Sequence, residues 1–90
     1  MEYSELQARR FARAYKKMRG AELAALHLAM DQVLKNPKIG SGKVGDLKGI
    51  YVYKFRCKRS HFLLAYSLNQ RSRTITWQAL GPHENFYRAL

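Results

Sequence analysis

The spacing of apolar residues changes once along the chain, near Gly49, and this change restricts the fold more than any other feature. Before this point apolar residues recur every three or four positions, which is typical of helices that bury one face. After it they recur every second position, which is typical of β-strands. Helices and strands are therefore expected in separate segments, which is the α+β class.

The N-terminal half predicts two helices. The first is expected to begin at Ser4, as its N-cap, and Gly20 interrupts its pattern. The second is expected to end at Asn36, because Pro37 follows. Because only a short turn at Arg19 and Gly20 joins them, the two helices should pack as an antiparallel hairpin. The apolar stripe of the first helix consists of Ala8, Phe11, Tyr15 and Met18.

The C-terminal half predicts three strands in series. They correspond to IYVYKFRCK, HFLLAYSL and TITWQAL, and NQRSR supplies a hairpin turn. The second is the most uniformly apolar, as expected for the middle of a sheet. Short links between the strands indicate an antiparallel meander of three or four strands, with the helical hairpin on one face. Trp77 is predicted to lie in the core.

One domain is expected over residues 1–90. Its parts are a helical hairpin at 4–35, a connector at 36–49, a sheet at 50–80 and a functional tail at 81–90, where Gly81 and Pro82 are expected to end the last strand. The connector includes GSGKVGDLKG, which has neither the Walker spacing nor a preceding strand. It is therefore interpreted as a flexible link and not as a nucleotide site.

The charge of the chain indicates a polyanionic partner. Seventeen Lys and Arg residues against six Asp and Glu residues give a net charge of +11. Cys57 is the only cysteine, so neither a disulfide nor a thiolate zinc site is expected, and we expect no metal or other cofactor. The sequence shows no signal peptide and no apolar run of membrane-spanning length, so a cytoplasmic location is expected.

Cationic and titratable residues near the predicted sheet suggest chemistry on RNA. Lys54, Arg56 and Lys58 alternate along one strand and would project from one face, roughly 7 Å apart. His83 and Tyr87 are four residues apart and would face one way on a short helical turn. A metal-free ribonuclease needs a general base, a general acid and cations that stabilise the phosphorane. The same residue types also hold single-stranded RNA without chemistry, so composition alone does not separate a nuclease from a binder.

The segments LKGIYVYKFRCKRSHFLLAYSL and ITWQALGPHENFY together resemble the RelE/ParE superfamily of toxins from type II toxin–antitoxin systems. The resemblance covers residues 47–87, and the preceding helical hairpin fits the family order. Its most specific parts are YKFRCK, the interval from there to Tyr66, and the pattern formed by Gly81, His83 and Tyr87.

The resemblance implies a RelE-like microbial RNase fold and a small basic toxin. An acidic antitoxin would neutralise it, in a heterotetramer or larger complex. RelE-like members cut messenger RNA in the ribosomal A site without a metal, whereas ParE-like members inhibit DNA gyrase and are not nucleases. We expect the RelE-like activity here; the alternatives are a gyrase inhibitor and a non-catalytic basic RNA-binding module.

By position, the resemblance assigns catalytic roles to four residues. Lys54 and Arg56 stand where RelE-like nucleases place two lysines, and His83 and Tyr87 match the histidine or arginine and the aromatic residue of the terminal pattern. The residues expected to contact RNA phosphates are Lys58, Arg59, His61 and Arg88.

The chain departs from the family pattern in three places. Leu63 replaces an arginine of many nuclease members, and Arg56 cannot act as a base because a guanidinium stays protonated. The second departure shifts general acid and base chemistry to His83. The segment MEYSELQ is too short and helix-like to predict the additional N-terminal strand of many relatives, so an open sheet edge is expected, which an antitoxin strand could cover.

Overall fold

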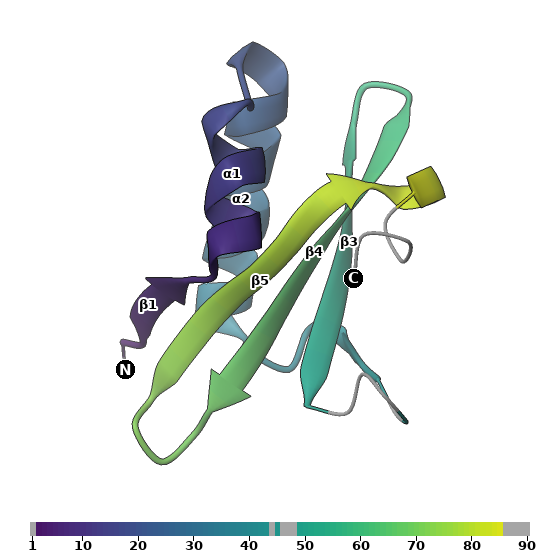
Figure 1. Ribbon diagram of the computed structural model, residues 1–90. Coiled ribbons are helices and arrows are strands. Elements are labelled where there is room, and N and C mark those ends of the chain that lie inside the picture. Colours follow the sequence, from purple (N-terminus) through teal and green to yellow (C-terminus); the bar gives the residue numbers. More distant parts are fainter. Residues whose placement is uncertain (1, 44, 46–48, 86–90) are drawn as a thin grey trace.

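The computed structural model describes residues 2–43, 45 and 49–85 (Figure 1). Two helices cover one face of a sheet that contains five strands within these residues. The elements, in chain order, are β1 (Ser4–Gln7), α1 (Arg9–Lys16), α2 (Gly20–Lys35), β2 (Ser41–Gly42), β3 (Ile50–Cys57), β4 (Ser60–Asn69), β5 (Thr74–Pro82) and a 3₁₀ turn (His83–Asn85).

The sheet has the strand order β1-β5-β4-β3-β2 and is mixed. The meander of β3, β4 and β5 is antiparallel, and β4 lies at its centre, as its uniformly apolar sequence predicts. The α+β class and the helical hairpin are confirmed. Within the predicted connector, β2 pairs with β3 through Ser41 opposite Val52, so part of this segment belongs to the sheet.

The expected start of the first helix at Ser4 is wrong, because this residue begins β1. This strand runs parallel to β5, and the Ser4 amide donates to the Arg73 carbonyl at 2.9 Å. Farther along, the Trp77 indole N–H donates to Glu5 Oε1 at 2.9 Å. All four residues of β1 are exposed, Leu6 by 58%, so no apolar alternation marks the strand in the sequence. The helix begins only at Arg9, after Ala8 as N-cap.

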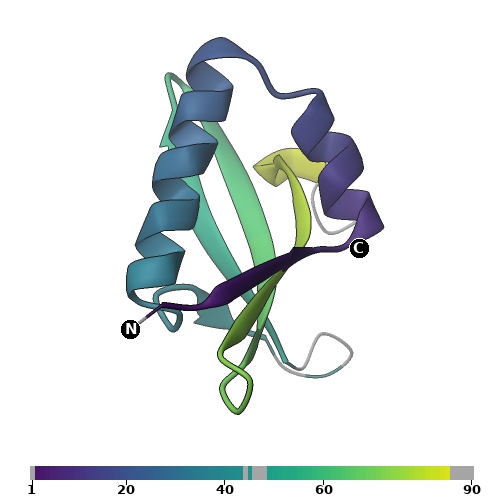
Figure 2. The same cartoon turned by 90° about the vertical axis from the view of Figure 1, so that its left-hand side faces the viewer.

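The helices run side by side in opposite directions over the same face of the sheet (Figure 2). α1 packs on β5 and α2 packs on β3, while the Tyr15 hydroxyl and His27 Nε2, 2.8 Å apart, link the two helices. Gly20, which interrupts the helical pattern, has a φ of +55°, a conformation that glycine adopts without steric cost. Neither helix in the described part of the chain has the length and apolarity that a membrane span requires.

The main core lies between the helices and the sheet. Trp77 is fully buried there, as predicted, and its ring lies 6.2 Å from that of Phe11. Cys57 is buried and reduced. The other fully buried large side chains of this core are Leu26, Val33, Leu64, Tyr66 and Ile75.

A β-bulge in β5 changes which residues face the core. Tyr66 pairs with Trp77, but Ala65 pairs with Ala79, so Gln78 is an extra residue. In a regular strand without a bulge, Trp77 and Ala79 would share a face. With it, Leu80 joins Trp77 in the main core, while Ala79 joins a second apolar cluster with Val52, Leu63 and Ala65.

Candidate active site

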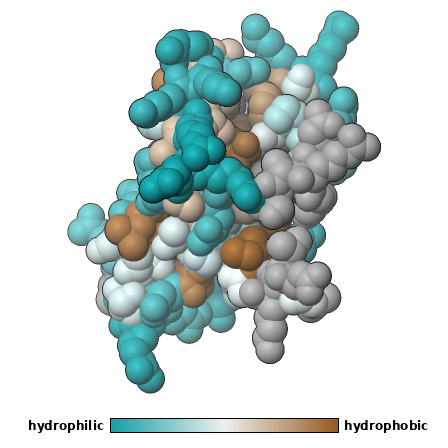
Figure 3. Space-filling view, in the orientation of Figure 1, coloured by the Kyte–Doolittle hydropathy of each residue, from teal (hydrophilic) through white to brown (hydrophobic). Residues whose placement is uncertain are grey.

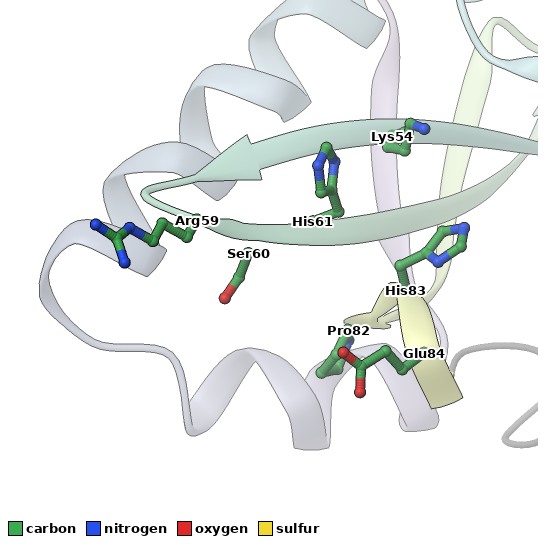
Figure 4. A pocket seen from close by; sticks show the side chains of 7 residues that line it. All are labelled: Lys54, Arg59, Ser60, His61, Pro82, His83 and Glu84. Atoms are coloured by element: carbon green, nitrogen blue, oxygen red, sulfur yellow. The ribbon is translucent and has the colours of Figure 1, made fainter.

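A hollow of about 390 Å³ lies where the β3–β4 hairpin meets the end of β5 (Figure 4). We call it the active-site hollow. It is an open depression at one end of the sheet and not an enclosed cavity. Its lining residues are Lys54, Arg59, Ser60, His61, Pro82, His83 and Glu84.

Strand register explains why residues distant in sequence meet here. Directly opposite residues of neighbouring strands lie on the same face with their Cβ atoms about 5 Å apart. Lys54 pairs with Leu63, and Leu63 pairs with Gly81, so these three share a face. His61 is two residues before Leu63 and His83 is two residues after Gly81, which brings the histidines to the same end of that face. Figure 4 shows Lys54, His61 and His83 close together on three neighbouring segments.

The expected end of the last strand near Leu80 is wrong, because β5 continues through Pro82. Pro82 pairs with Phe62, and β1 pairs with β5 only as far as Trp77. The end of β5 is therefore a sheet edge, where proline is tolerated although it lacks an N–H. The 3₁₀ turn follows directly, so His83 is positioned by a paired strand.

Four of the eight predicted site residues line the active-site hollow: Lys54, Arg59, His61 and His83. Lys54 was predicted to be a catalytic residue and Arg59 to contact RNA phosphates, and both line the same hollow. In Figure 4, Arg59 extends from the β3–β4 turn, away from the two histidines. Tyr87 and Arg88 lie outside the described residues.

Two predicted cations lie outside this set. Arg56 is directly opposite His61 and exposed, but its Nε donates to the Lys58 carbonyl at 3.2 Å, so it contacts the turn instead of the active-site hollow. Lys58 does not extend the predicted row, because β3 ends at Cys57 and Lys58 has a φ of +56°. It lines a separate depression beside Arg19 at the turn between the helices.

The polar side chains of the active-site hollow are available to a ligand. No hydrogen bond or ion pair joins the side chains of Lys54, Arg59, His61 or His83 to another residue in the described ranges. All four are exposed to solvent. Two imidazoles and two cations without such partners can meet a phosphate and exchange protons near it.

Sequence reasoning missed three residues that line the active-site hollow: Ser60, Pro82 and Glu84. Glu84 directly follows His83 in the sequence. It is exposed and contributes the one carboxylate among these lining residues. Its position next to His83 was the available signal, although spacing alone does not tell which way a side chain after a strand will point.

Leu63 lies directly opposite Lys54 on the neighbouring strand, at the position where many nuclease relatives were expected to carry an arginine. It is only 4% exposed and packs with Val52, Ala65 and Ala79. An arginine could not replace it there without disturbing this cluster, because a buried charge needs a partner. Arg59 is the cation of the lining that can take over a phosphate contact. No group of three or more potential metal ligands occurs within the described residues.

Comparisons with known proteins identify the family and the fold of the chain. Residues 6–90 match the family model for the ParE-like toxin of type II bacterial toxin–antitoxin systems. A search of curated proteins found no match.

Solved structures share the fold. A chain of the intact E. coli RelBE toxin–antitoxin complex superposes with a TM-score of 0.73 at 20% identity, covering 88% of this chain and 94% of that one. The isolated E. coli RelE toxin superposes with a TM-score of 0.73 at 20% identity, covering 89% of this chain and 83% of that one. A chain of the RelBE2 toxin–antitoxin complex from Mycobacterium tuberculosis superposes with a TM-score of 0.70 at 19% identity, covering 92% of this chain and 100% of that one. The RelE-like α+β fold is therefore shown.

Proposed function

The chain belongs to the ParE-like toxins of type II bacterial toxin–antitoxin systems, and we propose that it inhibits translation by cutting messenger RNA on the ribosome without a metal. The observation that carries this proposal is the pair of histidines, His61 and His83, next to Lys54 in one exposed hollow. A protein that only binds RNA needs cations and stacking surfaces but no pair of imidazoles that can accept and donate protons.

The proposed reaction is an internal transesterification of RNA. A general base takes the proton of a ribose 2′-hydroxyl, and the 2′-oxygen attacks the adjacent phosphorus. The bond from phosphorus to the 5′-oxygen breaks, and a general acid protonates this leaving oxygen. The products are a 2′,3′-cyclic phosphate and a 5′-hydroxyl end, so atoms and protons balance and no cofactor is consumed.

The lining residues supply the groups that this reaction needs. His83 and His61 are the acid and base pair, and Lys54 and Arg59 stabilise the charge on the phosphorane. Arg56, which is directly opposite His61 in the sheet but contacts the β3–β4 turn, adds positive charge near the active-site hollow. Tyr87 is the proposed aromatic group that stacks on a base or donates its hydroxyl.

A cognate acidic antitoxin is the proposed protein partner. Some of the RelE chains to which this protein is similar were solved in complexes with RelB antitoxins, among them chains from E. coli and from Pyrococcus horikoshii. A net charge of +11 favours an acidic partner, which would also stabilise the toxin by mass action. We place the toxin in the cytoplasm, where ribosomes and messenger RNA are found, and expect an assembly of two toxins with two antitoxins or larger.

Replacement of His83 by alanine tests the nuclease. His83→Ala should lower single-turnover cleavage of ribosome-bound messenger RNA by about 10²- to 10⁴-fold, with little change in melting temperature. His27→Ala is the matched control, because His27 is also exposed but lies on α2, outside the active-site hollow. It should cut like the wild type. Wild-type cleavage by His83→Ala, or products without 5′-hydroxyl ends, would refute the catalytic histidine.

A gyrase inhibitor is the second candidate. It is favoured by Leu63, which leaves the face beside Lys54 without the arginine of many nucleases, and by the ParE-like family model. Under this alternative, brief expression would produce gyrase-dependent DNA breaks while transcripts stay intact. Primer extension on messenger RNA and a DNA-break assay on the same cells separate the two activities.

A further inference from the structure

The active-site hollow contains a negative charge that the proposed cleavage reaction does not use. Glu84, in the 3₁₀ turn that follows β5, lines the hollow together with Lys54, Arg59, His61 and His83. It is the one carboxylate among the lining residues. A carboxylate repels RNA phosphates, so it weakens the attraction between the hollow and the RNA backbone. We therefore expect it to contact another part of the nucleotide.

The Glu84 carboxylate is available to a ligand. The side chain is exposed, and no hydrogen bond or ion pair joins it to another residue in the ranges that the structure describes. Within these ranges it neither orients an imidazole nor neutralises a cation. Figure 4 shows the Glu84 carboxylate and the His83 ring pointing in different directions. An ionised carboxylate accepts hydrogen bonds and donates none, so its ligand must carry donors.

The hollow has two unlike walls. The first carries the cations Lys54 and Arg59, from β3 and from the β3–β4 turn. In Figure 3, hydrophilic side chains cover the upper right of the molecule, where this turn lies in Figure 1. The second wall consists of Pro82, at the end of β5, and of His83 and Glu84 in the 3₁₀ turn. Pro82 is exposed and adds an apolar ring to the wall that carries the carboxylate.

These walls suit the two parts of a nucleotide. Cations on the first wall hold the RNA backbone, and such phosphate contacts position the strand without reading its sequence. A base directed at the second wall could place one face on the Pro82 ring, because every base has a flat apolar face. Its edge would then be read by Glu84. Single-stranded RNA is recognised in this way when an unstacked base exposes its Watson–Crick edge.

Guanine matches a carboxylate better than the other bases do. Its Watson–Crick edge carries the N1–H and the N2 amino group side by side, so both can donate to the two oxygens of one carboxylate. Adenine and cytosine each present one amino group beside a ring nitrogen that accepts. Uracil presents one N–H between two carbonyl oxygens. In these three bases the carboxylate would face acceptors, which repel it.

We propose that Pro82 and Glu84 form a nucleobase site, in which Glu84 selects a guanine next to the cleaved phosphate. This inference rests on the proposed cleavage of messenger RNA, and it names the base that the same hollow reads. The competing role for the carboxylate is proton transfer. A general base at Glu84 would act on every nucleotide alike, whereas a recognition residue changes the ratio between bases.

RNA that cannot be cleaved measures base preference separately from catalysis. The probes are fluorescein-labelled 2′-fluoro pentamers, UUGUU, UUAUU, UUCUU and UUUUU, which lack the 2′-hydroxyl that cleavage needs. Fluorescence anisotropy with the full wild-type chain at low salt should give a dissociation constant for UUGUU about tenfold below that for UUUUU. A further probe carries inosine in place of guanine. Because inosine lacks the N2 amino group, this probe should bind severalfold more weakly than UUGUU.

Variants locate the preference. Glu84→Gln should remove most of it, because the amide adds a donor that guanine repels and uracil accepts. Glu84→Ala should bring the four dissociation constants within about twofold of one another. Glu2→Gln makes the same chemical change at an exposed residue that does not line the active-site hollow, and it should keep the wild-type preference. The loss of one negative charge strengthens binding of every pentamer alike, so the ratio between pentamers isolates base recognition.

Cleavage sites test the same selection during catalysis. On ribosome-bound messenger RNA the wild type should cut mainly beside guanine, and Glu84→Gln should spread the cuts to other bases. A uniform loss of rate at every base would overturn the proposal and assign Glu84 to proton transfer. Equal binding of all pentamers, equal binding of the inosine probe, or a guanine preference that survives Glu84→Ala would also overturn it.

Failure of this site differs from failure of the nuclease. A chain that cuts no RNA but prefers UUGUU through Glu84 would support the base site and refute only the cleavage. A chain that cuts through His83 at all bases equally would support the cleavage and refute only the base site.

Discussion

At the scale of single residues, the Tyr66 hydroxyl ties the end of α2 to the sheet. It donates to the Pro37 carbonyl at 2.7 Å and accepts from the Gly40 amide at 3.1 Å. The backbone at Gly40 lies so close to the sheet that a Cβ at this position would be 2.8 Å from the Tyr66 hydroxyl and 3.0 Å from the Val52 carbonyl oxygen. Glycine is therefore required at position 40 by space, and the tyrosine by hydrogen bonding.

Replacement of Tyr66 by phenylalanine should lower the free energy of unfolding by about 1–3 kcal/mol, because a carbonyl and an amide lose their partner in a partly buried site. Urea denaturation near neutral pH measures this loss. Tyr53→Phe is the control, since the Tyr53 hydroxyl has no hydrogen bond to any residue in the described ranges. An equal effect of the two substitutions would show that the hydrogen bonds of Tyr66 contribute nothing specific.

The same hydroxyl should make stability depend on alkaline pH. Burial raises the pKa of Tyr66 above its ordinary value of 10.0, although the hydrogen bond from Gly40 opposes the shift. Below pH 10 the residue is protonated in both the folded and the unfolded chain, so its contribution is complete. As the pH rises further, the unfolded chain releases this proton first, and the contribution is lost as the pH passes the raised pKa. The stability difference between wild type and Tyr66→Phe should therefore shrink as the pH rises above 10, and a constant difference would contradict the raised pKa.

At the scale of elements, α1 begins without a side-chain cap. Its N-cap is Ala8, in an extended conformation with φ −70° and ψ 154°, and no side chain accepts from the first helical amides. Ala8→Ser should supply that acceptor and raise the free energy of unfolding by about 1 kcal/mol. Ala12→Ser, within the same helix, should lower it by a few tenths of a kcal/mol because serine is a weaker helix former. Thermal denaturation of both variants checks the contrast, and stabilisation by neither would mean that water already satisfies these amides.

The bulge in β5 lies a few residues before His83, and we expect it to set the direction in which the strand presents this side chain. Deletion of Gln78 would restore regular pairing and leave Trp77 and Leu80 facing the core, but it would reduce the local twist that a bulge adds. We expect a folded protein whose cleavage rate falls by about 10²-fold, because a shift of roughly 1 Å in a catalytic group can cost that much.

Gln78→Ala is the control for this deletion. It keeps the extra residue and removes only the hydrogen bond from Gln78 to the Ser67 hydroxyl, at 2.9 Å. Melting curves and single-turnover cleavage should separate the two variants. Normal cleavage by the deletion variant would show that the bulge does not position the histidine.

At the scale of the whole molecule, the net charge of +11 predicts RNA binding that weakens steeply with salt. Each phosphate neutralised on a single strand adds about −0.7 to the slope of log K against log salt. In a His83→Ala background, Lys54→Gln with Arg59→Gln should flatten that slope by about 1.4, because both cations line the active-site hollow. Binding of a short RNA measured at four salt concentrations gives the slope.

A matched control removes the same charge at the opposite end of the molecule. Lys35, at the end of α2, and Arg71, in the β4–β5 turn, are exposed and lie outside the active-site hollow. Lys35→Gln with Arg71→Gln should leave the slope nearly unchanged. If both pairs flatten it equally, RNA is held by the overall field of the protein and not by the active-site hollow.

The sequence by itself determined the elements whose stability comes from their own pattern. Period 3.6 around Phe11 and Leu26 predicted both helices, and period 2 after Gly49 predicted the β3–β4–β5 meander with Trp77 in its core. The sequence also determined the positive net charge of the protein, and it indicated Lys54, His61 and His83 as candidate site residues. These features depend on which side chains are buried away from water. The pattern of apolar residues along the chain is sufficient to predict this burial.

Only the tertiary structure decided the remaining features, because they depend on partners distant in sequence. All four residues of β1 are exposed, and the strand is held by pairing with β5 and by the hydrogen bond from Trp77 to Glu5, which no local sequence pattern predicts. β5 extends through Pro82 because this residue pairs with Phe62 of β4, and proline is tolerated there because β1 pairs only as far as Trp77. The bulge at Gln78 shifts the alternation that a period-2 pattern assumes. For the same reason Arg59, not Arg56, lines the active-site hollow: the direction of a side chain near a turn follows from backbone geometry that residue spacing does not specify.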